Sequence, residues 1–251
     1  MIPHHTVTGP HDAPVLVLSN SLGTTLEMWD AQAQALAERF RLVRYDTRGH
    51  GRSDTPPGPY TIDDVGRDVV ELLDHVGAER AHVAGVSLGG MTAMWLAIHA
   101  PQRVDRLVLL CTSPRMGPAE TWRERSATVR EHGTQAIVDA TMERWLTEDY
   151  RATHDISPLV EMFNGIDDEG YANCCAIIER MDQTAGLAQI GAPTLVIGGA
   201  QDPSTPPAEH AARIAAAIPG ARLEVLDPGA HLINVERPDE VTALIAGHLE
   251  G

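Results

Sequence analysis

Lysine is absent from this chain. All 19 of its basic residues are arginines, 35 residues are acidic, and the formal net charge is −16. A protein without lysine cannot form a Schiff base, attach pyridoxal phosphate or build the lysine-containing phosphate loop of many nucleotide-binding enzymes. The acidic balance also argues against nucleic acids and anionic membrane surfaces as partners.

Cysteine and long apolar segments are scarce as well. The three cysteines, Cys111, Cys174 and Cys175, are too few for a disulfide framework and fit a reducing compartment. No apolar run reaches the roughly 18 residues of a membrane span. The first residues, MIPHHTVTGPHDAP, lack the basic and apolar regions of a signal peptide. We therefore expect a cytoplasmic protein that does not bind membranes.

Short aliphatic runs alternate with helical patterns along most of the chain. Strands are predicted at 14–20, 41–46, 81–86, 105–111, 193–199 and 221–226, with a short edge strand at 4–9. Apolar residues with helical spacing occur at 30–40, 61–77, 89–100, 208–218 and 239–249. This alternation predicts an α/β fold with a mostly parallel sheet covered by helices on both faces.

The alternation stops between residues 115 and 190. Helical patterns continue there, at 119–133, 135–149 and 169–181, but no strong strand is present. An insertion placed after strand ends would lie over the crevice where such sheets bind ligands. We therefore divide the chain into a core, residues 1–114 and 191–251, and a helical cap, residues 115–190.

The segment GVSLG, residues 85–89, places Ser87 between two glycines at the end of a predicted strand and the start of a predicted helix. This is the setting of a nucleophile elbow, a turn so tight that only glycine fits two positions from the strained serine. The following helix would direct its positive end at the hydroxyl. Ser87 is therefore the candidate nucleophile, against the alternative of an ordinary glycine-rich turn.

A serine nucleophile needs a base that is oriented by a third group. In folds with this elbow the acid and then the histidine follow, each after a late strand. Asp202 ends one such strand and His231 comes just after the next, whereas Asp227 precedes Pro228 in a predicted turn. We expect the other histidines, which lack metal-ligand spacing, to lie at the surface.

The oxyanion formed in acyl transfer needs two hydrogen-bond donors. The backbone N–H of Leu88, directly after the nucleophile, is the first candidate. The second is the N–H of Leu22, in the loop LSNSLGTT (18–25) after the first long strand. The alternative is that this segment is a plain connecting loop.

The elbow, the order of the three residues and the segment YDTRGHGRSD (45–54) resemble the α/β-hydrolase superfamily over the whole chain. Within it, VLVLSNSLGTTLEMWD, RYDTRGHGRSD, GVSLGGM and EGYANCCAIIERMD are similar to segments of the 3-oxoadipate enol-lactonases. The resemblance implies a serine esterase without metal or cofactor. Its substrate would be a small anionic lactone of the β-ketoadipate pathway of aromatic-compound catabolism.

Two segments depart from the usual pattern of the superfamily. Asn20 and Ser21 stand where most members carry His-Gly, and this SNSLG loop is the element that best distinguishes the lactonases. Gln201 stands where many relatives have an acidic residue, which leaves the predicted triad acid unchanged.

An anionic substrate needs a local positive group in a chain of charge −16. Arginine grips a carboxylate through two parallel hydrogen bonds, and the cap carries Arg125 near Trp122 and Arg144 beside Trp145. We expect Arg125 first and Arg144 second as the carboxylate anchor, with Trp145 as an apolar wall. Alternatively, the helical stripe formed by Ile137, Thr141, Met142 and Trp145 is simply cap core, and Arg125 is a solvated helix residue.

Two other kinds of protein share these features. A carboxylesterase or a cofactor-free perhydrolase acting on small esters would use the same triad and differ only in its pocket. A ligand-binding receptor with this fold would keep the site without efficient turnover. The sequence predicts neither the oligomeric state nor the mobility of the cap.

Overall fold

Seven strands form the central sheet in a computed structural model that describes residues 1–251. In chain order they are β1 (His5–Thr8), β2 (Val15–Ser19), β3 (Arg41–Tyr45), β4 (Ala81–Val86), β5 (Val104–Leu110), β6 (Thr194–Gly199) and β7 (Arg222–Leu226). Their order across the sheet is β1-β3-β2-β4-β5-β6-β7, and only β1 is antiparallel to its neighbour. The predicted mostly parallel α/β sheet is confirmed.

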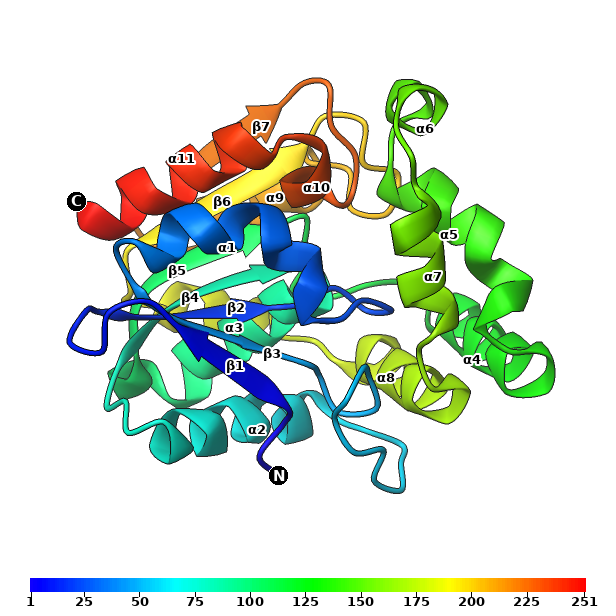
Figure 1. Cartoon of the computed structure of the whole chain (residues 1–251), viewed down its shortest axis with the longest axis horizontal. Helices are drawn as coiled ribbons and strands as arrows, with labels where there is room; N and C mark the ends of the chain where they lie inside the picture. Colours follow the sequence, from blue (N-terminus) through cyan, green and yellow to red (C-terminus); the bar gives the residue numbers. More distant parts are fainter.

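The central strands are aliphatic because helices cover both faces of the sheet (Figure 1). Every residue of β4 and of β6 is buried, so the usual alternation of apolar and polar residues is lost there. Helices α1 (Asp30–Ala37) and α11 (Pro238–Glu250) pack together on one face, and α2 (Ile62–His75) and α3 (Leu88–His99) on the other. Shorter helical elements are η1 (Leu26–Trp29), η2 (Pro101–Arg103), η4 (Thr184–Gln189), α9 (Ala211–Ala217) and α10 (Ile233–Glu236).

Residues 111–193 contain no strand and hold a group of helices to one side of the sheet (Figure 1). These are α4 (Ala119–His132), η3 (Thr134–Ile137), α5 (Val138–Trp145), α6 (Glu148–Thr153), α7 (Ser157–Asn164) and α8 (Asp168–Arg180). Within the group, α4 packs along α8. Treating residues 115–190 as a distinct cap stays our interpretation.

One predicted helix in this region, at 135–149, is interrupted. Helix α5 ends at Trp145, Leu146 is extended, and α6 starts at Glu148. Thr147 causes the restart, because its hydroxyl accepts a hydrogen bond from the Tyr150 N–H and caps the new helix. The single long helix was therefore wrong, and α7 was not predicted. No helix of the chain is long and apolar enough to span a bilayer.

Candidate active site

Ser87 occupies a strained turn between β4 and α3. Its φ of 54° and ψ of −114° lie outside the regions that most non-glycine residues adopt. The neighbouring glycines make the turn possible. A Cβ on Gly85 would lie 2.3 Å from Gly89 C, and a Cβ on Gly89 would lie 2.2 Å from the Ser19 carbonyl oxygen. The predicted elbow geometry is therefore present, and Ser87 stands at the carboxyl end of the sheet.

Two backbone N–H groups, one directly after Ser87 in the chain and one in the loop after β2, are the predicted oxyanion donors. The Leu88 N–H opens helix α3, and the first N–H groups of a helix have no acceptor within it. The Leu22 N–H has no acceptor in the protein, and both Leu22 and Ser87 line one cavity. This arrangement is compatible with the predicted oxyanion hole, which stays a prediction.

Asp202 and His231 are in direct hydrogen-bond contact. The distance between His231 Nδ1 and Asp202 Oδ2 is 2.8 Å, and both residues are buried. Asp202 also accepts hydrogen bonds from the Ser204 and Thr205 N–H groups and from the Thr205 hydroxyl, at 2.8, 3.1 and 2.5 Å. Burial raises the pKa of Asp202, but His231 and these donors outweigh burial and hold the pKa below its ordinary value. A permanently charged Asp202 would orient His231 and stabilise its protonated form.

His231 and Ser87 line the same cavity, which brings all three predicted triad residues together. The Ser87 hydroxyl makes no hydrogen bond within the protein, so the bond to His231 that a catalytic triad requires is not formed in the structure. The triad roles of Ser87, His231 and Asp202 therefore stay our prediction, now with a geometry that supports them. Asp227, the other carboxylate near His231 in the sequence, does not contact the histidine. Its Oδ1 instead lies 3.5 Å from Gln201 Nε2.

The cavity above Ser87 has a volume of about 170 Å³. This is well below the roughly 300 Å³ at which pockets for drug-sized ligands begin, so it suits a small substrate. Three predicted substrate-binding residues, Arg125, Arg144 and Trp145, line it. Trp145 is buried and packs edge-on against Phe163, with 5.5 Å between ring centroids. Trp145 therefore packs among the inserted helices and also forms part of the cavity wall.

The two arginines differ in what already holds them. Arg125 donates hydrogen bonds to the Tyr171 hydroxyl at 2.7 Å and to the Thr141 hydroxyl at 2.8 Å. Its guanidinium also lies 5.7 Å from the Tyr171 ring centroid. Arg144 has no hydrogen-bond or ion-pair partner in the protein, and its pKa is lowered by burial and by the charge of Arg125. The cavity thus contains one arginine engaged by the protein and one available to an anion.

Comparison with known proteins gives the site a family. The model of the alpha/beta hydrolase fold matches residues 14–139 and 142–238. The chain belongs to this family. This α/β hydrolase is 40% identical to 3-oxoadipate enol-lactonase 2 of Acinetobacter baylyi, over 94% of its own length and 88% of the relative's.

Solved structures agree with this placement of the α/β hydrolase. The enol-lactonase of Burkholderia xenovorans LB400 is 40% identical, with a TM-score of 0.96 over 99% of this chain and 96% of that one. A hydrolase from Pseudomonas aeruginosa PA01 is 43% identical, with a TM-score of 0.95 over 98% of this chain and 94% of that one.

One acidic residue of the α/β hydrolase joins the inserted helices to the loop that carries His231. Glu236 accepts hydrogen bonds from the Thr147 N–H and hydroxyl, at 2.7 and 2.8 Å, and from the Ala230 N–H at 2.5 Å. A backbone bond of 2.9 Å runs from the Leu232 N–H to the Trp145 carbonyl. The end of α5 is therefore fixed to the residues on either side of His231.

Sequence reasoning missed several residues that shape this site. Tyr171, which positions Arg125, carried no signal, since the two residues are 46 positions apart. Thr205, three positions after Asp202, could have been found from the local sequence. The expectation that all other histidines lie at the surface was wrong for His50, His82 and His248, which are buried. A signal for His50 was at hand in the segment YDTRGHGRSD, whose two glycines and two arginines indicate a folded loop rather than an exposed one.

Proposed function

We propose that this protein is a cytoplasmic serine hydrolase that opens the ring of 3-oxoadipate enol-lactone with water, giving 3-oxoadipate in the β-ketoadipate pathway. The observation that carries the proposal is the 40% identity, over 94% of the chain, with a protein named 3-oxoadipate enol-lactonase. The small cavity supports it, because it combines the Ser87 elbow with an arginine that lacks a counter-ion.

The first half of the reaction transfers the acyl group to the enzyme. His231 Nε2 takes the proton of the Ser87 hydroxyl, and Oγ forms a bond to the lactone carbonyl carbon. The Leu22 and Leu88 N–H groups stabilise the charge that develops on the carbonyl oxygen. The ring C–O bond then breaks, the leaving enol oxygen takes the proton from His231, and the enol rearranges to the ketone.

The second half returns the enzyme to its starting state. His231 removes a proton from water, and the resulting hydroxide attacks the ester carbonyl of the acyl-enzyme. The bond to Oγ breaks, Ser87 regains the proton from His231, and the new carboxylate is released. Asp202 stabilises the protonated His231 in both halves. The chemistry requires no group that this chain does not supply.

The carboxylate of the substrate is held by Arg144 in this proposal. The sequence favoured Arg125, but both hydrogen bonds of Arg125 go to the protein, so that it orders Tyr171 and Thr141 within the cavity wall. Arg144 lines the same cavity without a partner. A substrate carboxylate bound there supplies the counter-ion that Arg144 lacks. None of the acidic residues that give the chain its net charge of −16 pairs with this arginine.

The decisive experiment compares two substrates that differ by one negative charge and one methyl group. Steady-state kinetics are measured on the enol-lactone acid and on its neutral methyl ester. We expect a markedly higher kcat/KM for the acid. A higher value for the neutral ester would favour the second candidate, a carboxylesterase, which uses the same triad and oxyanion donors. The absence of turnover on both, and on a p-nitrophenyl ester, would indicate a binding protein instead.

A further inference from the structure

His50 is a buried histidine whose two ring nitrogens have different partners. It is 1% exposed, and its Nε2 accepts a hydrogen bond from the Gly23 N–H at 3.0 Å. Nδ1 lies 3.3 Å from the Arg48 carbonyl oxygen. These two contacts require one state of the ring, neutral, with the proton on Nδ1. Burial lowers the pKa of His50 to about 4, which keeps this state at neutral pH.

Gly23 belongs to the turn that presents the Leu22 N–H. The Thr24 N–H donates to the Ser21 carbonyl at 3.2 Å, and Gly23 has a φ of +83°. A positive φ at the third position is that of a type II turn, which differs from type I mainly in the orientation of its central peptide. That peptide joins Leu22 to Gly23, and its N–H is the one that His50 binds. His50 therefore holds the turn in one of its two forms.

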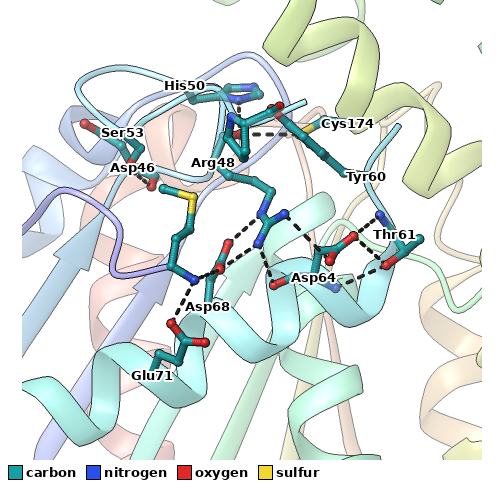
Figure 2. Close-up of polar contacts among 12 residues, drawn as sticks. Asp46, Arg48, His50, Ser53, Tyr60, Thr61, Asp64, Asp68, Glu71 and Cys174 are labelled. Atoms are coloured by element: carbon teal, nitrogen blue, oxygen red, sulfur yellow. Dashed lines mark hydrogen bonds and ion pairs between the residues drawn. The ribbon is translucent and has the colours of Figure 1, made fainter. Parts of the chain in front are cut away.

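The segment that carries His50 is itself held firmly. Figure 2 shows Arg48 paired with Asp68 of α2, with Nε and Nη2 at 2.6 and 2.7 Å from the two carboxylate oxygens. On its other side, Gly49 presses against α8, because a Cβ there would lie 2.5 Å from the Cα of Gly170. The carbonyl of Arg48 that accepts from His50 is thus fixed between two helices.

We propose that His50 is a positioning residue of the oxyanion hole, acting on the Leu22 donor through the hydrogen bond to Gly23. The inference rests on the proposed serine-hydrolase function, and it deepens it by extending the catalytic apparatus to the segment after β3. His50 does not line the cavity and contacts no reacting atom. Its effect is on the stability of the transition state, because the Leu22 N–H must be in place where negative charge develops.

The test uses two amides that differ in reach. In His50→Gln the side-chain oxygen reaches the position of Nε2 and accepts from the Gly23 N–H, whereas His50→Asn reaches only the Nδ1 position. We expect kcat to fall about tenfold to a hundredfold in His50→Asn with little change in KM, and to be largely restored in His50→Gln. His248→Asn is the control, since His248 is also buried but contacts the Pro193 carbonyl far from the site.

The kinetics are measured on p-nitrophenyl acetate as well as on the enol-lactone. Equal losses on both substrates are expected, because the oxyanion hole serves every acyl group. This keeps the test valid if the enzyme cleaves only the generic ester, in which case the substrate assignment fails and this inference stands. Unchanged kcat in a folded His50→Asn enzyme, or equal losses in the Gln and Asn variants, would overturn the inference. The inference is also overturned if kcat falls as much in His248→Asn as in His50→Asn.

Discussion

Replacing Arg144 by alanine tests how an acidic protein holds an acidic substrate. Truncating one partner of a buried charge pair costs about 2–5 kcal/mol, and a hydrogen bond to a charged group contributes about 1.5–3 kcal/mol. Arg144 lines the cavity, but the residue is exposed to solvent, which screens the interaction. We therefore expect the lower end, about 2 kcal/mol, which is roughly a 30-fold loss in kcat/KM on the acid.

The assay measures kcat/KM for the enol-lactone acid and for its methyl ester in each variant. Arg144→Ala should lose almost nothing on the ester, because the neutral group offers no carboxylate. Arg125→Ala should lose activity on both, because it releases Tyr171 and Thr141 from the cavity wall. Arg123→Ala is the control, since Arg123 pairs with Glu120 and Glu179 outside the cavity.

Two results would refute this reasoning. Equal losses of Arg144→Ala on acid and ester would give Arg144 a structural role in the inserted helices. An acid-specific loss in Arg125→Ala, with Arg144→Ala unchanged, would mean that Arg125 exchanges its protein partners for the substrate and that the sequence-based ranking was right.

Three further predictions concern the triad and His50. Ser87→Ala should lower kcat by several orders of magnitude, since triad members act as one unit, and a tenth or more of the activity in a pure sample would end the covalent mechanism. Asp202→Asn should lose about 10⁴-fold in kcat, whereas Asp227→Asn should be nearly silent, and reversed results would exchange their roles. His50 is neutral in the folded protein, where its pKa is about 4, against an ordinary value of 6.5. Its titration therefore leaves the free energy of unfolding unchanged above pH 6.5 and lowers it as the pH falls toward 4. Between pH 6.5 and pH 4, the free energy of unfolding measured with urea should fall by about 3 kcal/mol more in the wild type than in His50→Gln. Equal decreases in the two proteins would contradict the burial argument.

The elbow could be predicted from sequence because its strand, tight turn and helix follow one another directly. Gly85 is required by its close approach to Gly89 in the same turn, which the spacing shows, whereas Gly89 is required by its contact with Ser19 of β2, which the spacing does not show. The order of Asp202 and His231 after late strands is nearly as local, since parallel strands bring their carboxyl ends to one edge. Strand positions followed from aliphatic runs for the same reason.

The arginine anchor could not be ranked from sequence. What separates Arg125 from Arg144 is a hydrogen bond to Tyr171, 46 positions along the chain, and no pattern near Arg125 encodes it. The break between α5 and α6 is different. Apolar spacing runs through it, but Thr147 followed by two acidic residues is an N-cap signal that was there to be read.

The bond between Trp145 and Leu232 has a mechanical consequence. Because it ties the end of α5 to the residue after His231, a lid swinging on that end would drag the base away from Ser87 at each opening. Admission of substrate and alignment of the base would be coupled by such a movement. A movement of the inserted helices that leaves His231 in place would need its hinge at their other end. Met116 and Gly117 line the cavity there, and a Cβ on Gly117 would meet no atom within 4 Å.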